Sequence, residues 1–152
     1  MTSNILYLLL ATRDGNDCHL FREALGGIRI STQLECVADS RKLMEHFAGN
    51  PLKLPHIVFM ETGLPYCGGL GCLKKIRGDY AFSEVMLAVY SSAVKDESVE
   101  EAFVCGANIF LTRPDDFLVM KNQLIHIISV LWQYHALGLR KDFLLLNVGT
   151  DV

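Results

Sequence analysis

Apolar residues gather along the chain in five runs of strand length, and four of these runs are almost uninterrupted by polar residues. An uninterrupted apolar run predicts a strand that is buried on both faces, as strands of a parallel sheet are. The second run alternates apolar and polar residues and predicts a weaker strand. The five predicted strands are Ile5–Ala11, Thr32–Val37, His56–Met60, Val85–Tyr90 and Ala107–Leu111.

Between and after these strands lie segments with helical periodicity and helix-end signals. Asp39 and Ser40 are suited to cap the start of the second segment, and Gly106 to end the fourth in a left-handed conformation. Strands that alternate with helices through short connections predict right-handed crossovers and a doubly wound α/β domain. The five predicted helices are Asp17–Leu25, Asp39–Ala48, Gly69–Arg77, Asp96–Cys105 and Asp115–Tyr134.

Composition narrows the class of protein. The 152 residues suit one domain, and 51% hydrophobic against 20% charged residues, with a mean hydropathy of +0.27, exclude a disordered chain. A formal net charge of −3 is too balanced for the basic stripe that binds nucleic acid directly. No apolar run approaches the ~20 residues that span a bilayer, and the first run lacks the basic flank of a signal peptide. We therefore expect a soluble cytoplasmic protein without membrane or nucleic-acid contacts.

The five cysteines are odd in number and show no C-x-x-C spacing. Neither a disulfide framework nor a zinc site is indicated, and a reducing compartment fits this pattern. We expect the cysteines to act as small apolar side chains. They are Cys18, Cys36, Cys67, Cys72 and Cys105.

Several stretches together resemble the response-regulator receiver domain of the CheY-like kind. The segment Pro55–Pro65, followed by Gly69–Arg77, is similar to the family's third strand, acceptor loop and third helix. Leu20–Leu25 resembles its first helix, and Gly106–Pro114 resembles its "GAxxYLxKP" fifth strand and turn. The resemblance implies a flavodoxin-like sheet of five parallel strands, in the order 2-1-3-4-5, with five helices. It gives a receiver-like domain at 4–135 and a C-terminal extension at 136–152.

Receiver domains accept a phosphoryl group from a histidine kinase on an aspartate that ends the third strand. Magnesium, held by this aspartate and an acidic pair after the first strand, neutralises the phosphoryl oxygens, and a hydroxyl and a lysine then bind the phosphate. By resemblance, the acceptor position falls on Glu61, the acidic pair on Thr12 and Arg13, the hydroxyl on Ser91 and the lysine on Arg113. The hydroxyl is the one chemical type that is retained.

These replacements predict poor metal affinity. Arg13 brings a guanidinium that stays charged at any relevant pH to the place of a carboxylate, which leaves Asp14 as the nearby acid. Glu61 is one methylene longer than aspartate, which moves its carboxylate out of in-line geometry. We expect no metal and no cofactor. An internal ion pair of Glu61 with Arg13 or Arg113 would instead lock the loops, and the alternative is that both arginines are solvated at a decayed site.

Two further expectations concern the end of the domain. In relatives the bond at Arg113–Pro114 is generally cis, so the resemblance implies a cis peptide here, although only about 5–6% of such bonds are cis. The last helix is apolar around most of its surface, so either the tail, with Phe143–Leu146, or a second subunit should pack on it. The predicted partner or homodimer surface consists of Phe103, Phe110, Phe117, Ile128, Trp132 and Tyr134.

The sequence thus predicts an atypical receiver that is not phosphorylated by the magnesium-dependent route. It would act as a protein-interaction module whose partner is a histidine kinase or a downstream signalling protein, and not as an enzyme. Ser91 and Ser92 have no acid–base partner in the local sequence, which disfavours a catalytic serine. One alternative is an active phosphoacceptor that uses Glu61 or Asp14. Another is a ligand or redox sensor that uses the pocket or Cys67 and Cys72, near the acceptor loop.

Overall fold

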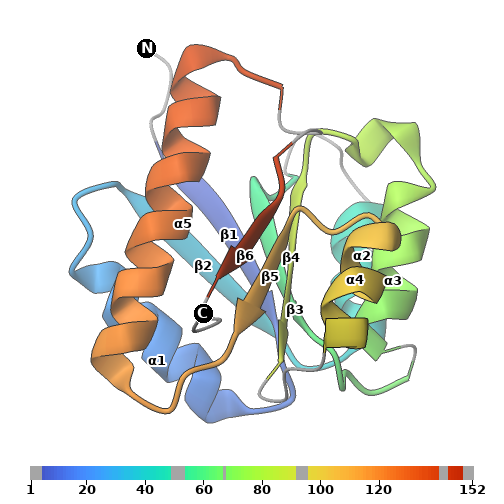
Figure 1. The fold of residues 1–152 in the computed structure, drawn as a ribbon, viewed down its shortest axis with the longest axis horizontal. Coiled ribbons are helices and arrows are strands. Elements are labelled where there is room, and N and C mark those ends of the chain that lie inside the picture. Colours follow the sequence, from blue (N-terminus) through green and yellow to red (C-terminus); the bar gives the residue numbers. More distant parts are fainter. Residues whose placement is uncertain (1–4, 49–53, 67, 92–95, 141–143, 149–152) are drawn as a thin grey trace.

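The computed structural model describes residues 5–48, 54–66, 68–91, 96–140 and 144–148. Six parallel strands form one sheet in the order β2-β1-β3-β4-β5-β6, with helices on both faces (Figure 1). The elements are β1 (Leu6–Ala11), α1 (Gly15–Gly26), β2 (Thr32–Val37), α2 (Ser40–Ala48), β3 (Ile57–Glu61), α3 (Gly68–Arg77), the 3₁₀ helix η2 (Tyr80–Phe82), β4 (Met86–Ser91), α4 (Asp96–Val104), β5 (Ile109–Thr112), α5 (Phe117–Leu137) and β6 (Leu146–Val148).

Alternate residues of the central strands supply two separate cores. On β1, Leu8 and Leu10 face the core that α1 and α5 cover, whereas Leu9 faces the core that α2, α3 and α4 cover. Successive side chains of a strand point to opposite faces, so a strand buried on both faces must be apolar at every position. The predicted flavodoxin-like, doubly wound fold and the order of the first five strands are confirmed.

The predicted helix ends are close to the observed ones. The Asp39 carboxylate accepts a hydrogen bond from the backbone nitrogen of Lys42, at 2.9 Å, and Gly106 adopts a left-handed φ of 110°. Asp14 and Asp116 cap the starts of α1 and α5 by accepting backbone hydrogen bonds. The last helix continues to Leu137, three residues beyond its predicted end, and α1 begins two residues before its predicted start.

The C-terminal segment adds a sixth strand that the sequence pattern did not predict. β6 runs parallel to β5, and the backbone nitrogen of Leu146 donates to the Asn108 carbonyl at 2.7 Å. Leu144, just before β6, is buried in the core beneath α5. Three residues are too few to give a periodic signal in the sequence, and in β6 Leu146 and Val148 are only half-buried while Asn147 is exposed. Phe143 lies outside the described residues.

Two expectations were wrong. The Arg113–Pro114 bond is trans, as are the other peptide bonds of the described residues. Only the resemblance favoured cis, and trans is the ordinary preference of such bonds. Cys18 and Cys36 form a disulfide, with their Cα atoms 6.3 Å apart, instead of acting as separate apolar side chains. They lie on α1 and β2, which become neighbours only in the folded chain, so their spacing gave no sign of the bond.

Two other cysteines have a described position. Cys72 is buried on α3, as expected of a small apolar side chain, and Cys105 is half-buried after α4. Cys67 lies outside the described residues. Within the described ranges, every helix lacks the combination of length and apolarity that a bilayer-crossing segment requires.

Candidate functional site

The loops that follow β1, β3, β4 and β5 meet at the carboxyl edge of the sheet, at the lower end of the molecule in Figure 1. All strands are parallel, so the residues after each strand share this edge. The candidate residues Thr12–Asp14, Glu61, Ser91 and Arg113 lie here, directly at or after the ends of their strands. Ser92 lies outside the described residues.

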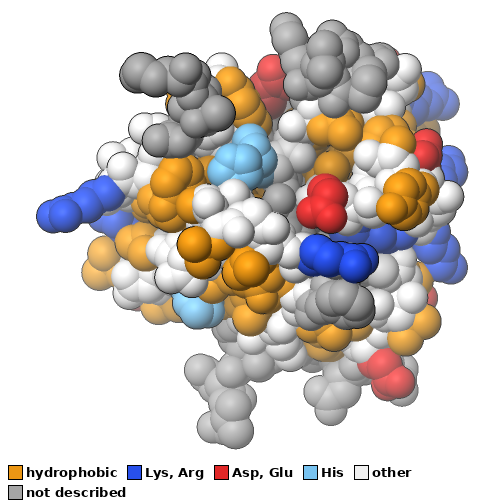
Figure 2. All heavy atoms as spheres, turned by 90° about the horizontal axis from the view of Figure 1, so that it is seen from above, with side chains coloured by type: hydrophobic (Ala, Val, Ile, Leu, Met, Phe, Trp, Pro, Cys, Tyr) orange, Lys and Arg blue, Asp and Glu red, His pale blue; other side chains and the backbone are white. Residues whose placement is uncertain are grey.

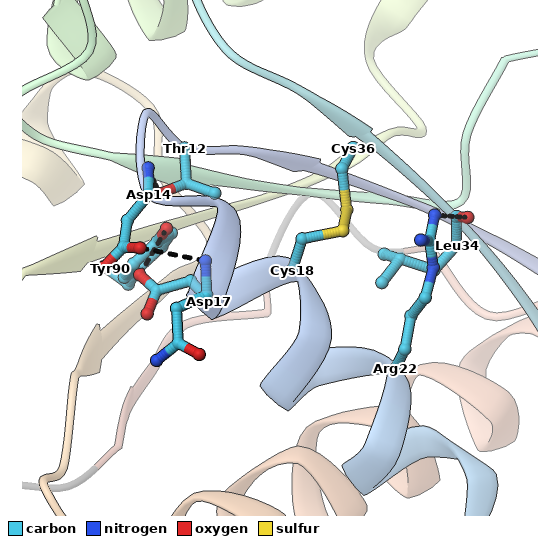
Figure 3. The surroundings of a disulfide bond; sticks show 9 residues. Thr12, Asp14, Asp17, Cys18, Arg22, Leu34, Cys36 and Tyr90 are labelled. Atoms are coloured by element: carbon cyan, nitrogen blue, oxygen red, sulfur yellow. Dashed lines mark hydrogen bonds between the residues drawn. A yellow bond between two sulfur atoms is a disulfide. The ribbon is translucent and has the colours of Figure 1, made fainter.

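The strongest polar contact of this edge joins Arg113 to Asp17. Asp17, in the first turn of α1, is 1% exposed, and its Oδ1 lies 2.5 Å from Nη2 of Arg113. The same guanidinium nitrogen lies 3.7 Å from Oδ2 of Asp14, whose side chain is 46% exposed. The Tyr90 hydroxyl donates to the other Asp17 oxygen at 3.4 Å (Figure 3). One arginine from the end of β5 therefore holds two carboxylates at the start of α1.

Burial changes the titration of both Asp17 and Tyr90. Removal from water raises the pKa of Asp17, and the nearby charges of Asp14 and Glu61 act in the same direction, whereas Arg113 opposes them. Burial also raises the pKa of Tyr90 far above its ordinary value, so its hydroxyl stays protonated and remains a donor. The carboxylate of Asp17 thus lies in a buried environment that disfavours its charged form.

Glu61 ends β3 and is bound by Arg13. Its Oε1 accepts a hydrogen bond from the backbone nitrogen of Arg13 at 3.0 Å, and lies 3.5 Å from Nε of the same residue. The two side chains differ in exposure, at 17% for Glu61 and 68% for Arg13. The Arg13 guanidinium lies over Gly63, where an added Cβ would be 3.5 Å from Nη2. Of the two arginines considered as partners of Glu61, it is Arg13 that the structure places beside it.

Thr12 and Ser91 shape the loops from within. The Thr12 side chain is buried, accepts a hydrogen bond from the Asp14 backbone nitrogen at 3.1 Å, and shares a side-chain hydrogen bond with Tyr90. Ser91 ends β4, is half-buried, and its carbonyl accepts from the Arg113 backbone nitrogen at 2.9 Å. Pro114 follows Arg113 in the half-buried turn toward α5. These contacts fix where the β1 and β5 loops leave the sheet.

A divalent cation such as the magnesium of receiver domains does not fit the residues present. Hard cations require free carboxylate oxygens in a near-octahedral arrangement. Here Arg113 lies against both Asp17 and Asp14, and Arg13 lies against Glu61. Within the part of the chain that the structure describes, no group of three or more His, Cys, Asp or Glu side chains is placed to hold a metal ion.

The residues of the predicted partner surface divide into two groups. Phe110 and Ile128 are fully buried inside the domain and cannot contribute to a partner surface, which corrects the prediction for these two. Phe110 lies on β5 in the core that α2, α3 and α4 cover, and Ile128 lies on α5 in the other core. The apolar periodicity could not distinguish these inner positions from an outer face. The remaining four, Phe103, Phe117, Trp132 and Tyr134, are half-buried.

Sequence reasoning missed Asp17 and Tyr90. Asp17 lies three residues after the cap Asp14, so it occupies the first helical turn, where an acidic residue is expected for its effect on the helix dipole alone. Tyr90 ends the predicted strand Val85–Tyr90 as one more apolar position, and its ring is buried in the structure. A signal was present in both: Asp17 opens the predicted helix after the first strand, and Tyr90 is the last residue of the predicted strand Val85–Tyr90.

The geometry can be compared with that of known proteins. No protein-family model and no curated protein matches the sequence. Solved structures match instead. The phosphorylated cyanobacterial phytochrome response regulator RcpA is 18% identical, with a TM-score of 0.73 over 86% of this chain and 95% of that one. The Mn²⁺-bound response regulator Rcp1 is also 18% identical, with a TM-score of 0.73 over 82% of this chain and 92% of that one.

A third similar structure is the response regulator RPA3017 in red light signalling of R. palustris. It is 20% identical, with a TM-score of 0.70 over 85% of this chain and 92% of that one. These likenesses show that the chain has the fold of response-regulator receiver domains. Function does not follow from a fold, so it must be argued from the site.

Proposed function

We propose that this chain is an atypical response-regulator receiver, which works in two-component signalling as a protein-interaction module without magnesium-dependent phosphorylation. The fold supports the receiver assignment, because structures of response regulators cover most of the chain. One observation carries the atypical character: the Arg113 guanidinium bridges Asp17 and Asp14 at the edge where receivers carry out phosphoryl transfer.

Charge distinguishes this edge from a magnesium-dependent site. Phosphoryl transfer depends on positive charge that neutralises the oxygens of the transferred group, and in receivers a metal ion supplies it. In this chain Arg113 and Arg13 neutralise the carboxylates themselves. A metal would have to displace a guanidinium from a carboxylate that is 1% exposed. The negative charge at this edge is thereby balanced without an added group.

The alternative is a receiver that remains active through Glu61 or Asp14. Asp14 favours this alternative by its exposure, since nearly half of its side chain is accessible. Its Oδ1, however, caps α1 through the Asn16 backbone nitrogen at 2.9 Å, and its Oδ2 faces Arg113. Glu61 accepts the Arg13 backbone hydrogen bond. Phosphorylation of either residue would remove a contact that shapes the loop.

The test is incubation of the purified chain with acetyl phosphate and MgCl₂, followed by intact-mass spectrometry. The wild-type chain is expected to show no phosphoryl mass increment. A variant with Arg13→Asp, Glu61→Asp and Arg113→Lys together rebuilds most of the family's set, and we expect it to gain a magnesium-dependent increment. A magnesium-dependent increment on the wild-type chain would refute the proposal in favour of the active alternative.

The module would also pair with a second copy through α5. Leu118 and Val119, at the start of α5, are 66% and 45% exposed, and Phe117 beside them is half-buried. Large apolar side chains in such a cluster are commonly covered by a partner. Light scattering of the wild type and of Leu118→Glu is the test: a dimer that the substitution splits supports the pairing, and a monomer at every wild-type concentration refutes it.

A further inference from the structure

The disulfide between Cys18 and Cys36 connects the edge of the sheet to the helix that carries the acidic residues. Cys18 directly follows Asp17 on α1, and Cys36 lies on β2, where it pairs in register with Leu10 of β1. Figure 3 shows Asp14 and Asp17 on one side of the start of α1 and the disulfide on the other. Both cysteines are half-buried, so the bond lies close to solvent.

A hollow lies between the same two elements. Its volume is about 300 Å³, and Arg22 of α1 and Leu34 of β2 are among the residues that line it. Arg22 follows Cys18 by four residues and Leu34 precedes Cys36 by two, so each shares a face with its cysteine. Nη2 of Arg22 donates to the Leu34 carbonyl at 3.3 Å, beside the disulfide in Figure 3. Cys18 and Cys36 do not line the hollow themselves, but a molecule in it would meet the guanidinium of Arg22, one helical turn from Cys18.

We propose that Cys18 and Cys36 form a reversible redox site of the folded protein, which exchanges with a small thiol that carries carboxylates. This function goes beyond the proposed interaction module and does not depend on it. The hollow admits the thiol, and Arg22 attracts its carboxylates. The site differs from the acceptor-loop cysteines Cys67 and Cys72, on which the sequence alone placed a redox role.

The exchange proceeds in two balanced steps. A thiolate of the small molecule attacks one sulfur of the disulfide, the Cys18–Cys36 bond breaks, and its electron pair leaves on the other cysteine, which takes up a proton. A second small thiolate then attacks the sulfur of the bound small molecule in the mixed disulfide. The second protein thiol leaves with that electron pair and is protonated. Two small thiols have become one small disulfide, and the protein has gained two electrons and two protons.

The redox state of Cys18 and Cys36 would affect Asp17 and Arg113 through the first turns of α1. Asp17 and Cys18 are adjacent on the helix, so the bond that fixes Cys18 to β2 also limits how far the Asp17 carboxylate moves from Arg113. Apolar contacts and the Arg22–Leu34 hydrogen bond also connect α1 to the domain and do not require the disulfide, whereas reduction removes the covalent link at this turn. Reduction is therefore expected to loosen the contact between Asp17 and Arg113.

The experiment equilibrates the folded chain with mixtures of reduced and oxidised glutathione, traps free thiols by alkylation, and measures intact mass. The expected result is a reversible two-electron transition while circular dichroism stays native. The backbone amide signals of Asp17 and Arg113 should differ between the two forms in NMR spectra. The double variant Cys18→Ser/Cys36→Ser should show no transition. Cys105→Ser, which removes a half-buried free cysteine, should keep it.

The role of the Arg22 charge in the hollow is tested by the rate at which thiols reduce the disulfide. Arg22→Gln should slow reduction by glutathione several-fold and leave reduction by uncharged 2-mercaptoethanol unchanged. Equal effects on both thiols would refute recognition of the carboxylates. A pair that stays in one state at every glutathione ratio, or that exchanges only in denatured chain, would overturn the redox site. A transition that leaves the Asp17 and Arg113 signals unchanged would overturn its link to the acidic cluster.

Discussion

The two ends of the parallel sheet hold buried polar groups in opposite ways. At the amino end, Asn108 is 3% exposed and neutral, and its Oδ1 accepts from the Leu87 backbone nitrogen at 3.0 Å and from the Arg77 guanidinium. Its Nδ2 donates to the Leu144 carbonyl at 3.1 Å, just before β6. At the carboxyl end, Asp17 is as deeply buried but charged, and its partners are the charged Arg113 and the Tyr90 hydroxyl.

This difference separates a structural role from a functional one. A neutral amide whose partners are mostly backbone groups stabilises one arrangement of the chain at any pH. A buried ion pair contributes less to stability, because desolvation offsets the attraction. Its charges, however, can be altered by protonation, by a bound ion or by a binding partner. Figure 2 views the end where the strands begin, and hydrophobic, histidine and charged side chains are mixed on that face. We therefore expect the amino end to govern stability and the carboxyl end to govern response.

The largest effect is expected for Asn108→Ala. The substitution leaves the Leu87 nitrogen, the Leu144 carbonyl and part of the Arg77 guanidinium without their amide partner in a buried place. We expect the free energy of unfolding to fall by ~3 kcal/mol or more, measured by urea denaturation. The control Asn147→Ala, on the exposed side of β6, should change it by less than about 0.5 kcal/mol. Equal effects of the two variants would abolish the distinction between the ends.

The next effect concerns pH and Asp17. Burial raises the pKa of this carboxyl above 3.8 in the folded chain, so between 3.8 and the raised value the folded state binds more protons than the unfolded state. Stability contributed by this group is therefore present at low pH and is lost as pH rises through that window. Subtracting the stability of Asp17→Asn from that of the wild type isolates the effect. The difference should fall as pH increases from about 3.8.

At pH 7, Asp17→Asn should cost only about 1 kcal/mol, because Arg113 is a third exposed and keeps Asp14 nearby. Urea denaturation at a series of pH values provides both measurements. A wild type that gains stability over Asp17→Asn as pH rises would contradict the pKa direction, and would mean that the pair with Arg113 outweighs burial.

The sequence was sufficient to predict the strands and helices, but not which residues and strands contact one another. Uninterrupted apolar runs such as 57–60 and 86–90 belong to strands buried on both faces, so the parallel sheet follows from local pattern. The order of the strands came from the resemblance, because periodicity carries no information on neighbours. β6 was missed because it is short, half-buried and stabilised by long-range contacts with Asn108 and β5.

The candidate site was found at the right edge but with the wrong partners. Parallel strands of an α/β fold end at one edge of the sheet, and this rule identified Glu61 and Arg113 as candidate residues. Which carboxylate Arg113 binds depends on the three-dimensional position of α1, and Asp17 lies on that helix, not in a loop. The Cys18–Cys36 bond was missed for the same reason, since spacing along the chain does not report distance between a helix and a strand.

A smaller effect is expected for Tyr90→Phe. The ring is buried and would remain packed, while the hydroxyl that donates to Asp17 at 3.4 Å is lost. We expect a loss of ~1 kcal/mol of unfolding free energy, and a larger NMR shift at Asp17 than at Asn108. Tyr80→Phe is the matched control, because Tyr80 is 90% exposed. A Tyr90→Phe variant that is as stable as the control would show that the hydroxyl adds nothing to the carboxyl-end cluster.

The smallest effect is expected for the pair of Arg13 and Glu61, and a double-mutant cycle with Arg13→Ala and Glu61→Gln measures it. Because the Arg13 side chain is 68% exposed and its Nε lies 3.5 Å from the carboxylate, water and salt screen the attraction. Glu61→Gln also retains an oxygen that can accept from the Arg13 backbone nitrogen. The coupling energy from urea denaturation should be below about 0.5 kcal/mol and should vanish in 1 M salt. A coupling above about 1 kcal/mol that persists in salt would mean that this loop is held as firmly as the Asn108 end, so that the carboxyl end is rigid and not responsive.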